Sequence, residues 1–138
     1  MLNNRSCPPS TVIPELAYAD VGEAADWLCR HFGFTVRIRI ANHRVQLNVG
    51  DGAMVVTELR GGAKGGDSAH SVMVRVEDVH AHHERAKRGG VQIARPPADH
   101  PYGERQYTAV DLGGHVWTFT QSIADVAPED WGGVSGQL

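Results

Sequence analysis

The chain has 138 residues, 41% of them hydrophobic and 21% charged, and a formal net charge of −3. This length predicts one domain over residues 1–138 with a modest core. The weak negative charge argues against nucleic acid as a partner, and no apolar run approaches the ~20 residues of a membrane span, so we expect no membrane partner. The two cysteines are too few for a disulfide framework, which favours a cytoplasmic location.

The first half of the chain predicts one helix among several strands. Residues 1–11 are polar, contain two prolines and are typical of a flexible arm. Asp20 is a good helix N-cap with Glu23 three residues later, as in a capping box. Gly33 is a typical helix end. We therefore expect a helix over 22–31 and strands over 12–19, 34–40, 43–49 and 53–59.

The second half repeats this order. Four glycines in residues 60–69 indicate a linker. Asp78 precedes a predicted helix over 79–88 that ends at a glycine pair. Strands are expected over 71–76, 91–94, 106–110 and 116–120, with a loop at 98–103. The tail, 123–138, is expected to hold at most one helical turn after Pro128.

The hairpin around residues 111–115 and the internal repeat are the most informative features. The order strand, Asp-Val, helix, Gly, strands occurs twice, which predicts two βαβββ modules. On these residues the chain resembles the vicinal oxygen chelate superfamily, also called the glyoxalase/bleomycin resistance protein/dioxygenase superfamily. The carrying segments are ADV at 19–21, Trp27, FGF at 32–34, VRVEDV at 74–79, GGV at 89–91, YGER at 102–105 and DLGGHVWTF at 111–119.

The resemblance implies an α+β fold of tandem βαβββ modules that form an open, mixed β-sheet cleft with flanking helices. Module one is expected over about 12–60, the linker over 60–69 and module two over about 70–122. A homodimer is also implied by the resemblance. Enzymes of the family hold one divalent metal ion through four strand positions, two in each module.

The four positions carry few metal ligands in this chain. They fall at Ile13, Glu58, Ser71 and Thr118, and only Glu58 is a strong ligand. His70 lies one residue from the third position, and a strand bulge would be needed to turn it to the same face. We therefore expect no metal cofactor, with Glu58 and His70 as the alternative metal ligands.

A second set of residues, on the second predicted helix, has a spacing that could hold a metal ion. His80, His83 and Glu84 have the i, i+3, i+4 spacing that presents side chains on one helix face. Because His82 and His83 fall on the predicted core stripe of the helix, a solvated or partly packed histidine face is the favoured interpretation.

A cleft without metal would be lined by a mixed set of side chains, as small-molecule sites commonly are. The predicted ligand-binding residues are Glu15, Met54, Glu58, Ser71, Met73, Arg75 and Thr118. For the charged members, mutual ion pairing is the alternative to ligand contact.

The favoured function is a small-molecule-binding protein that sequesters an organic ligand in the sheet cleft, without the family metal site. The alternative is a metal-dependent lyase, isomerase or dioxygenase of the same superfamily, which would use one divalent metal ion. A metal-free enzyme with Glu15 or Glu58 as general base is the third possibility. The sequence leaves open whether the protein is an enzyme.

Overall fold

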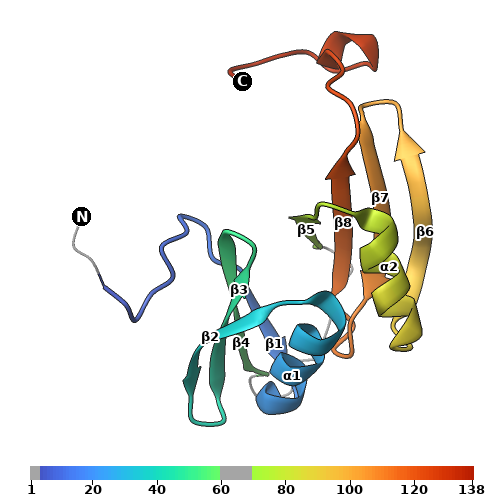
Figure 1. The fold of residues 1–138 in the computed structure, drawn as a ribbon. Coiled ribbons are helices and arrows are strands. Elements are labelled where there is room, and N and C mark those ends of the chain that lie inside the picture. The colour runs from blue at the N-terminus through green and yellow to red at the C-terminus, as the bar shows by residue number, and fades with distance from the viewer. Residues whose placement is uncertain (1–3, 60–69) are drawn as a thin grey trace. The chain divides into compact units, whose positions relative to one another are not determined.

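The structure, a computed structural model, describes residues 4–59 and 70–138 (Figure 1). The predicted linker at 60–69 lies outside the described residues. By internal packing the chain divides into two compact units, of which the first contains residues 4–59 with 111–115 and the second contains 70–110 with 116–138. None of the helices in the described part of the chain is long and apolar enough to cross a membrane.

The first module has the predicted βαβββ order. Its elements are β1 (Glu15–Tyr18), α1 (Val21–Phe32), β2 (Thr35–Ile40), β3 (Arg44–Val49) and β4 (Gly52–Glu58). They form a four-stranded sheet in the order β1-β4-β3-β2, in which β1 and β4 are parallel and the other pairs antiparallel. The sheet is therefore mixed, as expected.

The second module repeats this topology. Its elements are β5 (Val72–Arg75), α2 (Val79–Arg88), β6 (Gln92–His100), β7 (Glu104–Val110) and β8 (Val116–Ser122), followed by the short helix η1 (Pro128–Asp130). The sheet order is β5-β8-β7-β6, with β5 parallel to β8. Tandem βαβββ modules and the α+β class are thus confirmed, while the open cleft that they form together stays a prediction.

Helix ends follow the predicted capping chemistry. The Asp20 carboxylate accepts a hydrogen bond from the Glu23 backbone N–H at 2.9 Å, and Asp78 does the same for Ala81 at 3.0 Å. Gly33 ends α1 in the left-handed region, with φ of 80°. Local side-chain chemistry therefore sets both helix starts.

Each helix covers one face of its own sheet. In the first module α1 buries Leu28 and Phe32, and the sheet buries Tyr18 and Leu47. In the second module His82 of α2 contacts the ring of Phe119, with ring centroids 4.1 Å apart. We call the other face of each sheet, which points away from its helix, the open face.

Strand β6 differs from the prediction. A short strand at 91–94 and a loop at 98–103 were expected, but β6 continues through Pro96 and Pro97 to His100. The prolines are tolerated because β6 is the edge strand, so a missing N–H breaks no ladder on its outer side. The pairing with β7 shifts register twice in this stretch, between Ile93 and Arg95 and between Arg95 and Ala98.

Candidate functional site

The open face of the first sheet differs from the predicted one in strand β4. Glu15 pairs with Val55, and Leu16 pairs with Val56. Every second residue of a strand points to the same face of the sheet. Met54 and Glu58 therefore share the face of Val56 and Leu16, which the helix covers, and not the face of Glu15. The prediction that they line the same face as Glu15 was wrong.

This error has a clear physical reason. Residues 53–56 of β4 are all buried, so apolar and polar side chains do not alternate along this strand. The sequence therefore does not indicate which of these residues point to which face of the sheet. Met54 is 2% exposed and lies opposite Leu47, which places it in the core of the first unit. Glu58, at the end of β4, is exposed and lies opposite Tyr18.

Glu15 has an ion-pair partner within its own sheet. Its Oε1 lies 2.5 Å from Arg44 Nη2, and both side chains are substantially exposed. The predicted alternative was mutual pairing among Glu15, Glu58 and Arg75, whereas the partner of Glu15 is Arg44, which lies outside that set. Exposed pairs of this kind contribute about 0.2–1 kcal/mol to stability.

The open face of the second sheet agrees with the prediction. Met73 pairs with Thr118, and Arg75 pairs with Thr120. Met73 is 61% exposed although it lies within a strand. Ser71 and His70, which directly precede β5, are exposed. Met73, Arg75 and Thr118 thus share a face that points away from α2.

Glu104 belongs to this open face and was missed. Its Oε1 accepts hydrogen bonds from Thr120 Oγ1 at 2.5 Å and from Gln106 Nε2 at 3.1 Å. It was missed because the strand was expected to begin at residue 106, whereas β7 begins at Glu104. Residues 104–106 are all polar, so no alternation of apolar and polar side chains marked the earlier start of β7.

A buried polar network in the first unit surrounds the turn at 111–115. Asp111 accepts hydrogen bonds from the Tyr18 hydroxyl at 2.5 Å and from the backbone N–H groups of Gly113 and His115, each at 2.9 Å. His115 Nε2 lies 2.9 Å from the Ala17 carbonyl oxygen. Burial of the phenol, then the charge and hydrogen bond of Asp111, raise the pKa of Tyr18 above its ordinary value.

A pocket of about 390 Å³ adjoins this network at the start of α1. Its lining includes Tyr18 and Leu112, with Asp20 and Glu23 as its charged members. The volume lies at the lower end of the range for small-molecule sites. The pocket shares no residue with the predicted ligand-binding set.

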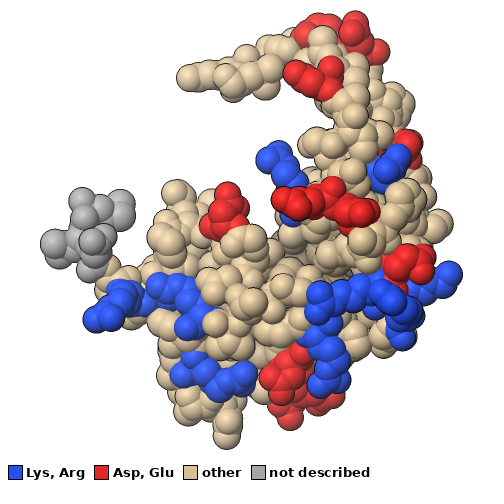
Figure 2. Space-filling model, in the orientation of Figure 1, with Lys and Arg blue, Asp and Glu red and all other residues tan. Residues whose placement is uncertain are grey.

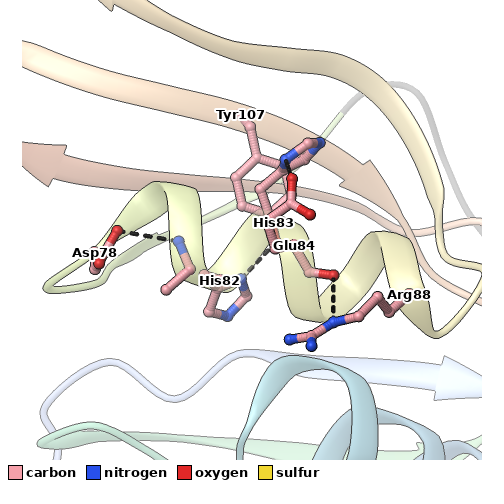
Figure 3. Close-up of polar contacts among 7 residues, drawn as sticks. Asp78, His82, His83, Glu84, Arg88 and Tyr107 are labelled. Atoms are coloured by element: carbon pink, nitrogen blue, oxygen red, sulfur yellow. Dashed lines mark hydrogen bonds and ion pairs between the residues drawn. The ribbon is translucent and has the colours of Figure 1, made fainter.

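Two of the histidines of α2, His82 and His83, pack against the second sheet (Figure 3). His82 Nδ1 lies 2.5 Å from the Tyr107 hydroxyl oxygen, and the His83 ring meets the Tyr107 ring edge-on at 5.2 Å. His83 also lies 3.6 Å from Glu84, whereas His80 is exposed. These contacts agree with the partly packed histidine face that was favoured.

The residues at the predicted metal positions do not fit a divalent ion. In the structure Glu58 lies on the helix-covered face, and the neighbouring open-face position is Thr57, a neutral hydroxyl. Ile13 has no ligand atom, and Ser71 and Thr118 offer only hydroxyls. Within residues 4–59 and 70–138 there is no group of three or more His, Cys, Asp or Glu side chains suited to hold a metal ion.

Alkaline pH is expected to destabilise the fold through its buried tyrosines. The pKa values of Tyr18 and Tyr107 are both raised, by burial first in each case. Above pH ~10 the unfolded chain loses these protons while the folded chain keeps them, so the unfolded state is favoured. Each tyrosine should lower the free energy of unfolding by up to about 1.4 kcal/mol per pH unit. Urea unfolding between pH 8 and 11 gives the free energy of unfolding of wild type and of Tyr18→Phe as a function of pH. This free energy should fall less steeply with pH in the variant, and an equal slope in both proteins would refute the prediction.

A family model and a solved structure each match most of this chain. A family model described as the Glyoxalase/Bleomycin resistance protein/Dioxygenase superfamily matches residues 12–119. The solved structure of TioX from Micromonospora sp. ML1 is 36% identical, with a TM-score of 0.70, over 86% of this chain and 100% of that chain. A search of curated proteins gave no significant match.

More distant solved structures share the fold alone. The fosfomycin resistance protein FosX from Listeria monocytogenes is 16% identical, with a TM-score of 0.67, over 81% of this chain and 92% of that chain. A glyoxalase/bleomycin resistance protein/dioxygenase from Nocardioides is 20% identical, with a TM-score of 0.63, over 94% and 89%.

Proposed function

Because the chain belongs to the glyoxalase/bleomycin resistance protein/dioxygenase superfamily, we propose that it binds an organic small molecule on the open faces of its sheets, without the metal ion of the family enzymes. The binding is stoichiometric, and apolar contact supplies most of the affinity while a few polar groups orient the ligand. The protein acts as a homodimer.

The exposed Met73 carries this proposal. Met73 is 61% exposed within a strand, and its flexible thioether can adapt to varied apolar ligand surfaces. Thr118 lies beside it, and Arg75 lies beside Thr120 on the same face. Glu104, bonded to Thr120, adds a carboxylate. This face combines an apolar contact with oriented donors and acceptors.

The charges and ligand atoms of the described residues support the same proposal. Figure 2 shows both basic and acidic side chains on the face that it draws, and the formal net charge of −3 gives the chain no electrostatic reason to bind a phosphate backbone. The hydroxyls and Ile13 at the expected metal positions favour direct ligand contact over chelation. FosX, which shares the fold, is named for resistance to the antibiotic fosfomycin.

Ligand binding is expected to survive removal of metal and to depend on Met73. Wild-type protein is treated with a chelator, and aromatic and antibiotic-like compounds are screened for those that raise the melting temperature. Met73→Glu should abolish the shift because the ligand would bury an unpaired charge. Val134→Glu is the matched control, since Val134 is 91% exposed in the tail.

Two results would contradict the proposal. One is near-stoichiometric metal per chain, found by elemental analysis of protein purified without chelator, together with loss of ligand binding when that metal is removed. This outcome would support the metal-dependent lyase, isomerase or dioxygenase alternative. The other is a ligand-induced shift that Met73→Glu leaves as large as in Val134→Glu.

A further inference from the structure

The N-terminal arm, residues 4–8, lies on the open face of the first sheet. Three successive backbone carbonyls of the arm accept hydrogen bonds from two side chains of that sheet. Arg37 donates to the Arg5 carbonyl at 2.9 Å and to the Cys7 carbonyl at 3.3 Å, and Gln46 donates to the Ser6 carbonyl at 2.8 Å. The arm therefore contacts the sheet chiefly through its main chain.

Arg37 and Gln46 form one preorganised donor pair. Arg37 Nη1 also donates to Gln46 Oε1 at 2.5 Å, which orients the amide so that its N–H group points at the arm. Gln46 is 3% exposed and lies opposite Val55, on the face that carries Glu15. A nearly fully buried amide needs a hydrogen-bond partner, and the arm supplies it.

Among the described residues, few other contacts would hold the arm. Pro8 is buried, whereas residues 4–7 and Pro9 are exposed. Its internal bonds are local, from Ser6 to the Asn4 side chain and from the Cys7 backbone N–H to the Asn4 carbonyl. The cost of ordering a short segment is comparable with the gain from a few hydrogen bonds and one buried ring. We therefore expect only a small net free energy to hold the arm in place.

We propose that the Arg37–Gln46 pair is a binding site for consecutive amide carbonyls of an extended peptide backbone, and that the arm is its built-in occupant. Release of the arm uncovers these donors on the open face of the first sheet. The arm then competes with any ligand that presents carbonyl oxygens to the same pair. This competition rests on the proposed function, whereas peptide binding by the pair does not.

A spin label on Cys7 in the full-length chain tests release of the arm. Cys7 is exposed, and Cys29→Ser removes the other thiol. Pro8→Gly and Arg37→Met should each increase label mobility, because each removes one anchor of the arm. Pro9→Gly and Arg39→Met are matched controls: Pro9 is exposed, and Arg39 lies near Asp26 at 3.5 Å, not near the arm. Equal mobility in the test and control variants would overturn the docked arm.

A peptide of residues 4–11, NRSCPPST, tests the site itself. Isothermal titration should show saturable binding to the Pro8→Gly variant, about tenfold weaker binding once Arg37→Met is added, and unchanged binding with Arg39→Met. Absence of saturable binding, or equal binding with and without Arg37→Met, would overturn the carbonyl site.

If the arm is docked about nine-tenths of the time, compounds from the screen that use this face should bind Pro8→Gly roughly tenfold more tightly than wild type. Peptide binding without that gain would contradict the competition alone and leave the site standing.

Discussion

Replacing Asp111 with alanine is expected to lower the free energy of unfolding by about 3 kcal/mol. The carboxylate is 5% exposed and accepts three hydrogen bonds, from the Tyr18 hydroxyl and from the backbone N–H groups of Gly113 and His115. Alanine leaves the Tyr18 hydroxyl, in a side chain only 1% exposed, without this acceptor. Urea unfolding followed by fluorescence measures the loss.

Two further variants show whether the hydrogen bonds cause this loss. Asp111→Asn keeps an oxygen acceptor and should lose less than Asp111→Ala. Asp125→Ala, at an exposed position in the tail, should stay within about 0.5 kcal/mol of wild type. A double-mutant cycle with Tyr18→Phe should give a coupling energy of about 1 kcal/mol or more. A loss in Asp111→Ala no larger than that in Asp125→Ala would refute the assignment.

Local chemistry made much of the fold predictable. Asp20 and Asp78 marked the helix starts because an N-cap acts within three residues of itself. The turn around Asp111 was recognisable for the same reason, since the Asp side chain bonds nearby backbone. The repeat of these signals then gave the two modules, because short-range rules applied twice require no knowledge of tertiary contacts.

The open faces of the sheets were harder to predict because they depend on strand register. In β8 the aromatic residues Trp117 and Phe119 alternate with Thr118 and Thr120, so Met73, Arg75 and Thr118 were assigned to a common face correctly. In β4 both faces are buried, and the pairing of Val55 with Glu15 decides which residues face outward. The predicted register of β4 was wrong by one residue, so Met54 and Glu58 were assigned to the open face in place of Val55 and Thr57. Whether the predicted residues bind a ligand stays a prediction.

Long-range polar contacts left no signal of their own in the sequence. The bonds from Arg37 to the carbonyls of Arg5 and Cys7 join segments about thirty residues apart through main-chain acceptors that every residue has. An arm that is polar and contains prolines predicts flexibility, and only the geometry of Arg37 and Gln46 shows where it docks. Glu104 was missed for a simpler reason, an underestimate of the length of β7.

Gly103→Ala is expected to be more damaging than an ordinary glycine substitution. Gly103 has φ of +85° in the turn between β6 and β7, where an alanine would be strained by about 1 kcal/mol or more. A Cβ would also lie 2.1 Å from the Ala124 carbonyl oxygen, a backbone atom that cannot rotate away. The tail would have to move, which would break the hydrogen bonds from the Ile123 and Ala124 N–H groups to the Gly103 carbonyl.

The total loss in Gly103→Ala should be about 3 kcal/mol, the sum of backbone strain and lost tail contacts. Gly90→Ala separates the two contributions, because Gly90 has φ of +77° but nothing within 4 Å of an added Cβ. It should lose only about 1 kcal/mol. Urea unfolding compares the variants, and hydrogen exchange at the Ile123 and Ala124 amides reports release of the tail. Equal losses in both variants, with these amides still protected, would mean that the tail contact contributes nothing and that strain alone keeps glycine at position 103.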